Sequence, residues 1–120
     1  MQYIIMAYTD EKLWPHLAAA EKEQRFFAAY SVYVEALNKA GVLKGMNRLR
    51  PVAEGVTVRV SDGRQRVLDG PYADSKEQLG GYFLIDAPDL DAALGWAARC
   101  PAAAHGTVEV RPIYEPCQQL

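Results

Sequence analysis

The chain has 120 residues and a mass of 13.3 kDa, which is the size of one domain. Half of the residues are apolar and 23% are charged, and this composition excludes disordered and collagen-like proteins. Thirteen basic and 15 acidic residues give a formal charge of -2, without the positive charge of a general nucleic-acid binder. We therefore expect no direct contact with nucleic acid.

No apolar run approaches the roughly 20 residues that a membrane-spanning helix needs. The apolar start of the chain, residues 1–8, lacks the basic segment of a signal peptide. Cys100 and Cys117 belong to no CxxC pair or Cys/His cluster, so we expect free thiols and no metal site. Phosphate-binding and nucleophile-elbow motifs are absent from the sequence. These observations predict a cytoplasmic protein without a cofactor and without a membrane partner.

The first half of the chain predicts a strand, a helix and a second strand. Residues 3–8 are apolar on both sides, which is typical of a central strand. Apolar residues at spacings of three and four predict a helix over 17–40. This apolar stripe consists of Phe26, Tyr30, Tyr33, Val34 and Leu37. A strand over 42–49 follows, with a bulge at Lys44 and Gly45.

The second half begins with a predicted β-hairpin. Alternating valines indicate a strand over 56–61, Asp62-Gly63 is a strong turn signal, and 64–68 returns as the partner strand. A central strand over 80–86 comes after a polar connection. Asp89 is expected to cap a helix that Pro101 ends, and 107–113 is the last strand.

This order of elements, β-α-β, hairpin, β-α-β, predicts an α+β chain with a ferredoxin-like split βαβ fold and an inserted β-hairpin. Right-handed crossovers place both helices on one face of the antiparallel sheet. The other face would then expose apolar residues of the first strand, which is unusual in a monomer. We therefore expect a homodimer through the open sheet face. The domain is expected to cover residues 1–115, and 116–120 to form a C-terminal tail.

Residues 69–82, with the sequence DGPYADSKEQLGGY, resemble the signature of the DGPF-domain or YCII-related proteins, and Tyr72 stands where the family name has Phe. The resemblance extends over residues 1–113 and includes PDLDAAL at 88–94 and VEVRP at 108–112. It implies a dimeric α/β barrel, and it implies no settled activity. Some members accompany extracytoplasmic-function sigma factors, and a distant relative eliminates hydrogen chloride from a chlorinated aromatic intermediate.

The wider group has a proposed catalytic His–Asp pair whose histidine lies on the first helix. Residues 17–40 of this chain contain no histidine, so that pair does not transfer. Asp69 is the candidate for the aspartate role. Its plainer interpretation is a turn residue that caps backbone N–H groups, whereas the functional one places Asp69 and Tyr72 in a pocket between the sheet face and the DGPY loop.

The remaining candidates are polar or aromatic residues near the predicted sheet. His105 precedes the last strand and is preferred over His16 as an acid–base residue if its loop reaches the open sheet face, with a solvated loop as the alternative for both. Lys76 belongs to a run that is either solvated or closes over an anionic ligand.

Glu109 and Arg111 alternate with valines and should face the open side, where an ion pair is expected. Arg111 and Arg48 could instead bind a carboxylate or phosphate. Tyr82 belongs to a set of strand aromatics that are core, interface or ligand-binding residues.

Three functions fit these observations. The first is an enzyme or binding protein for a small molecule, performing cofactor-free proton transfer with Asp69 and His105 as catalytic residues. Its ligand would contact Tyr72, Lys76, Arg48, Arg111 and Tyr82. The second is a regulatory module that interacts with an extracytoplasmic-function sigma factor. The third is a structural dimer without a ligand.

Overall fold

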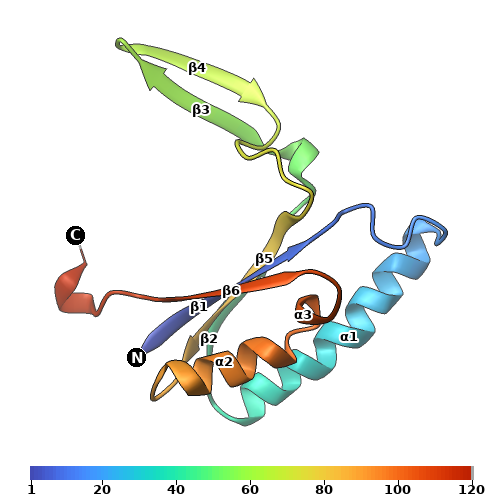
Figure 1. Cartoon of the computed structure of the whole chain (residues 1–120), viewed down its shortest axis with the longest axis vertical. Helices are drawn as coiled ribbons and strands as arrows, with labels where there is room; N and C mark the ends of the chain where they lie inside the picture. The colour runs from blue at the N-terminus through green and yellow to red at the C-terminus, as the bar shows by residue number, and fades with distance from the viewer. Residues whose placement is uncertain (120) are drawn as a thin grey trace.

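The computed structural model describes residues 1–119 of the chain. Its main sheet is antiparallel and has four strands in the order β2-β5-β1-β6 (Figure 1). These strands are β1 (Gln2–Thr9), β2 (Leu43–Arg48), β5 (Gln78–Asp86) and β6 (Thr107–Pro112). The register of β2 against β5 shifts between Leu43 and Gly45, which confirms the predicted bulge.

Two longer helices, α1 (Ala19–Lys39) and α2 (Leu90–Arg99), pack on one side of this sheet (Figure 1). The Asp89 carboxylate accepts a 2.9 Å hydrogen bond from the backbone N–H of Ala92, so the predicted cap of α2 is confirmed. A short helix α3 (Ala102–His105) follows Pro101 and was not predicted. Four residues are too few to show helical periodicity, and proline is tolerated where a helix begins.

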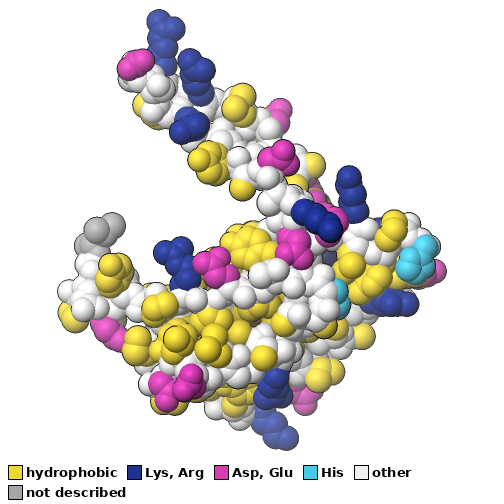
Figure 2. Space-filling model, in the orientation of Figure 1, with side chains coloured by type: hydrophobic (Ala, Val, Ile, Leu, Met, Phe, Trp, Pro, Cys, Tyr) yellow, Lys and Arg dark blue, Asp and Glu magenta, His cyan; other side chains and the backbone are white. Residues whose placement is uncertain are grey.

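The hairpin of β3 (Val56–Ser61) and β4 (Arg64–Asp69) forms a separate two-stranded sheet. Asp62 and Gly63 both have positive φ, 52° and 73°, as a two-residue hairpin turn requires. The hairpin projects from the side of the main sheet opposite to the helices and stands clear of the body (Figures 1 and 2). A short 3₁₀ helix, η1 (Val52–Glu54), precedes it.

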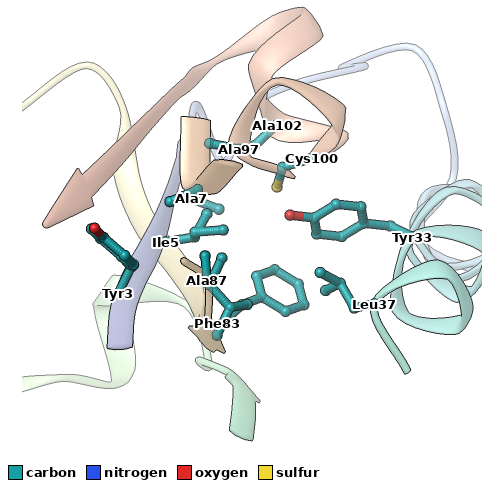
Figure 3. Packing of buried hydrophobic residues seen from close by; sticks show 12 residues of the cluster. Tyr3, Ile5, Ala7, Tyr33, Leu37, Phe83, Ala87, Ala97, Cys100 and Ala102 are labelled. Atoms are coloured by element: carbon teal, nitrogen blue, oxygen red, sulfur yellow. The ribbon is translucent and has the colours of Figure 1, made fainter. Parts of the chain in front are cut away.

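The core lies between the main sheet and the helices (Figure 3). Ile5 and Ile85 of the sheet and Leu37 of α1 are fully buried. Tyr33 is also buried, and its hydroxyl donates a 2.9 Å hydrogen bond to the backbone carbonyl of Trp96 in α2. The predicted helical stripe is thus confirmed, because Tyr33 and Leu37 are buried and the other members are half-buried.

The opposite face of the sheet carries no helix. Its strand residues alternate with those of the core and are half-buried, chiefly Ile4, Met6, Tyr8, Tyr82 and Leu84. Glu109 pairs with Met6 and Arg111 with Ile4 in the register, so both belong to this open face, as predicted. Within residues 1–119 neither side chain takes part in a salt bridge, so the ion pairing expected of them inside a dimer stays a prediction.

At the end of the chain, residues Pro116–Gln118 form a 3₁₀ turn, η2, and Leu120, the last residue of the predicted tail, lies outside the described residues. Cys100 is buried, Cys117 is exposed, and no bond joins the two. No helix over residues 1–119 combines the length and apolar character needed to cross a membrane.

Candidate functional site

A cavity of about 430 Å³ lies between the first half of α1 and the helix-facing side of the sheet. It exists because α1 contacts the sheet closely only in its second half, where Tyr33 and Leu37 are buried. In the first half Phe26 is half-buried and Phe27 is 74% exposed. The loop between β1 and α1 closes the side of this space with Leu13, Trp14 and neighbouring residues.

The floor of the cavity is made of small residues on the central strands. Ala7 of β1 lies opposite Gly81 of β5 in the register, and both line the cavity. A side chain at Gly81 would place its Cβ 2.8 Å from the backbone oxygen of Asn47 in β2. Two bulky residues at these positions would fill the space, so the sequence of the strands itself creates the cavity.

The wall is aromatic and neutral. Phe26 stacks on Tyr30 with 4.5 Å between ring centroids, and Tyr30 stacks on Phe83 at 6.1 Å. Burial raises the pKa of Tyr30, and the nearby thiol of Cys100, 4.0 Å from the tyrosine hydroxyl, adds to the effect. Burial likewise raises the pKa of Cys100. Both groups therefore stay protonated at neutral pH, and this part of the wall carries no charge.

Arg48 brings a paired charge to the cavity from the end of β2. Its guanidinium donates two hydrogen bonds, of 2.8 and 2.7 Å, to the carboxylate of Glu23 on α1. It also lies 3.9 Å from the centroid of the Phe26 ring. The hydrogen bond and the charge of Arg48 lower the pKa of Glu23, and the hydrogen bond to Glu23 raises the pKa of Arg48. The pair joins helix to sheet beside the aromatic wall.

His105 enters the cavity lining from the end of α3. Its ring meets the Trp14 ring edge to face at a centroid distance of 5.5 Å. Trp14 has a φ of 57°, a left-handed conformation that is rare for a bulky residue. Arg25 covers the same indole at 5.4 Å. The indole is therefore held between a helix residue and the one histidine that lines the cavity among residues 1–119.

Of the seven predicted site residues, the structure brings Arg48, His105 and Tyr82 to this cavity. The alternation of β5 places the Tyr82 side chain on the open face of the sheet, where its hydroxyl accepts a 2.8 Å hydrogen bond from the Asn47 side chain. Only Arg48 and His105 thus offer charged or titratable side chains of the predicted set to the cavity.

The other four predicted residues lie elsewhere. Asp69 ends β4 opposite Val56, and its carboxylate makes no hydrogen bond within residues 1–119, so the predicted capping role is wrong. Tyr72 is 77% exposed and lies beside Arg59 of the hairpin. Lys76 is exposed in the following loop.

Arg111 is exposed on the open face, and His16 is exposed in the loop before α1. Asp69, Tyr72 and the loop that carries them are absent from the lining of this cavity, so a pocket between the DGPY loop and the sheet face stays a prediction. The loop follows β4 at the base of the hairpin and leads into β5 (Figure 1), a placement that periodicity in the sequence does not reveal.

Part of the 69–82 signature has a structural role that the sequence did not indicate. The Gln78 side chain accepts a 3.0 Å hydrogen bond from the backbone N–H of Glu11 and donates one of 2.8 Å to the carbonyl of Ser75. The neighbouring Glu77 carboxylate accepts a 2.7 Å hydrogen bond from the Thr107 hydroxyl. These contacts join the loop after β1, the start of β5 and the start of β6 at the edge of the cavity.

Sequence reasoning missed the cavity itself. The available signal was three small residues in otherwise bulky central strands, Ala7, Gly80 and Gly81. Within the described chain, residues 1–119, no three His, Cys, Asp or Glu side chains gather closely enough to hold a metal ion. The lining combines the His105 imidazole, the Arg48–Glu23 pair and an aromatic wall with further charged residues at Asp10, Glu11, Lys22 and Arg25.

Comparison with known proteins gives two matches. The YCII-related domain family matches residues 1–116. An uncharacterised protein of Rhizobium meliloti (strain 1021) is 37% identical over 123 aligned residues, which cover 97% of this chain and 96% of that protein.

Proposed function

The chain belongs to the YCII-related domain family, and from that premise we propose that it acts on or binds a small molecule in the cavity beneath α1. The observation that supports this most is the cavity itself, whose volume of about 430 Å³ falls within the range of small-molecule sites. Its lining combines apolar walls with a few polar groups, which is the usual composition of such sites.

His105 is the acid–base residue of this proposal. It is the one titratable imidazole in the lining among the described residues, and its contact with Trp14 orients the ring. A proton transfer to or from a bound molecule needs only such a group within hydrogen-bond reach of the reacting atom. The Arg48 guanidinium has two N–H groups that donate hydrogen bonds to the Glu23 carboxylate. An anionic group of the ligand would bind these N–H groups in competition with Glu23.

A fragment library screened by ligand-observed NMR tests the binding site. Ala29→Phe fills the cavity from α1, and Ala28→Phe is the matched control, since Ala28 is an exposed neighbour outside the lining. We expect fragments that bind the native chain to lose at least tenfold in affinity with A29F and to keep their affinity with A28F. Equal binding to all three proteins would contradict the proposed site.

The two histidines give an internal control for the role of His105. A fragment in the cavity should shift the imidazole NMR signals of His105 and leave those of His16, which is exposed and outside the lining, unchanged. Shifts at neither histidine, or at His16 alone, would remove His105 from the proposal.

The homodimer through the open sheet face is also part of this proposal. The strand order β2-β5-β1-β6 with helices on one face supports a ferredoxin-like fold, and the half-buried apolar residues of the other face support a dimeric α/β barrel. Ile4, Met6 and Leu84 would then contact a second copy. The regulatory alternative, with an extracytoplasmic-function sigma factor as partner, keeps its support from the family resemblance alone.

A further inference from the structure

The β3–β4 hairpin is amphipathic although neither of its faces is covered. Its register places Val58 opposite Val67, and Val56 and Val60 belong to the same face. These four valines are 54–70% exposed. The opposite face carries Arg59, Arg64 and Arg66. In antiparallel sheets this alternation is typical of one buried and one solvated face, so the valine face indicates a contact that its own chain does not supply.

An isolated two-stranded hairpin is at best marginally stable in water. Here the hairpin extends from the body, and the radius of gyration of 16.4 Å exceeds the roughly 13–14 Å expected of a compact chain of this length. At the base of the hairpin, a 2.7 Å hydrogen bond from the Gly70 N–H to the Gly55 carbonyl joins the segments that flank its two strands. A contact with another molecule would supply the apolar burial that the hairpin lacks.

The hairpin and the open sheet face lie on the same side of the molecule. Figure 1 shows the helices on one side of the sheet and the hairpin extending on the other, and Figure 2 shows the open space between hairpin and body. A molecule that packs on the open sheet face is therefore placed beside the hairpin. One occupant can cover both apolar surfaces.

Charge favours a second copy as this occupant. The hairpin, residues 56–69, contains three arginines and two aspartates, a net charge of +1, which leaves -3 on the rest of a chain whose total is -2. Arg59 and Arg66 face each other directly across the hairpin, and like charges in that position are unfavourable without an acidic neighbour. On the open face, Glu109 has no ion-pair partner within residues 1–119, so it adds to the negative charge of the body that a second copy presents.

From these observations we propose that the β3–β4 hairpin is a docking arm whose valine face packs against a second copy of this chain. This inference rests on the sheet-face homodimer proposed above and adds a second contact to it. Each copy of a two-fold dimer would extend one arm to the other copy. The apolar face of the arm supplies burial, and its arginines favour approach to the acidic body.

Sedimentation equilibrium of the full-length chain tests the arm. Val58→Thr/Val67→Thr keeps the branched side chains of the strands and removes apolar surface, and Val32→Thr, at a 68% exposed valine on α1, is the matched control. We expect the dimer dissociation constant to rise at least tenfold with V58T/V67T and to change less than twofold with V32T. Unchanged circular dichroism would show that the variants fold.

A third variant separates the two proposals, because Met6→Lys places a charge on the open sheet face and should yield a monomer. If V58T/V67T retains the native dissociation constant while M6K is monomeric, the docking arm is wrong and the sheet-face dimer stands. A native chain that remains monomeric at millimolar concentration would overturn both, and the hairpin would then belong to another kind of partner.

Discussion

The body and the hairpin use similar apolar residues with opposite results. In the body, Ile5, Ile85 and Leu37 reach zero exposure between sheet and helices. In the hairpin, Val58 and Val67 face each other in a regular ladder and remain 55% and 54% exposed. Both regions have the alternating or periodic patterns that predict a buried face. The spacing of apolar residues therefore predicts a buried face, but it does not identify the molecule that buries that face.

The body and the hairpin also differ in the role proposed for each, which is ligand binding for the body's cavity and association for the hairpin. The cavity lies within the body, where His105 and the Arg48–Glu23 pair are fixed by three elements of secondary structure. The hairpin contributes no residue to that cavity. Changes in the core and the cavity of the body should thus affect folding and ligand binding, whereas changes in the hairpin should affect association. The following predictions test this division, starting with the largest effect.

Leu37→Ala should cost about 3 kcal/mol of the free energy of unfolding, because it removes a fully buried side chain from the core. Val58→Ala in the hairpin should cost less than about 1 kcal/mol, measured at concentrations where the chain is monomeric. Urea denaturation followed by circular dichroism measures both. Equal costs would contradict the contrast between body and hairpin.

Gly81→Ala should lower the free energy of unfolding by about 2 kcal/mol, since its Cβ would lie 2.8 Å from the backbone oxygen of Asn47. Its neighbour Gly80 is the control, because a Cβ there meets only the Ala7 oxygen at 3.9 Å. Thermal unfolding of G81A and G80A should show a lower midpoint for G81A. A smaller decrease of the unfolding midpoint for G81A than for G80A would contradict the close approach of Gly81 to the Asn47 backbone.

Tyr33→Phe should cost about 1 kcal/mol, because it leaves the Trp96 carbonyl without the hydrogen bond that the tyrosine hydroxyl donates. Tyr72→Phe, at an exposed hydroxyl outside the body, should leave stability unchanged. Parallel urea titrations of the two variants measure the difference. A neutral Y33F would show that the hydroxyl does not tie α1 to α2.

Glu23→Gln should have the smallest effect, visible only in the pH dependence of stability. The pKa of Glu23 is lowered in the folded chain by its hydrogen bond from Arg48. The stabilisation is thus present above the ordinary glutamate pKa and is lost as the pH falls through the lower folded value. Unfolding midpoints of E23Q and the native chain should converge below about pH 4, in the range where free glutamate is protonated. Glu35→Gln on the same helix serves as control, and a constant difference at all pH values would contradict the role of the pair.

Much of the fold could be predicted from local patterns. The strand at 56–61, the turn at Asp62-Gly63 and the cap at Asp89 follow from side chains that act on their own backbone, and all three are confirmed. The helix after Pro101 escaped prediction because four residues show no period. Local patterns determine element type, so these features were accessible without knowledge of the tertiary structure.

The candidate site was less accessible because it depends on distances between elements. Arg48 and His105 were chosen for their chemistry, and the structure brings both to the cavity. Asp69 was chosen with the DGPY turn, and it ends β4 at the base of the hairpin, outside the lining of the cavity. Trp14 and Ala7 were not chosen, since a left-handed aromatic residue and a small residue in a strand acquire meaning only when the cavity is known. A cavity is the space that packed side chains leave empty, whereas the patterns in a sequence indicate which side chains are buried.

Hydrogen exchange of the native chain at two protein concentrations tests the central division between body and hairpin most directly. Backbone amides of β3 and β4 should exchange more slowly tenfold above the dimer dissociation constant than tenfold below it, because a second copy covers the arm. Amides of the core strand β5 should be slow under both conditions, since Phe83 and Ile85 are buried within one chain. Hairpin exchange that is fast and identical at both concentrations, in a chain shown to be dimeric at the higher one, would contradict the account.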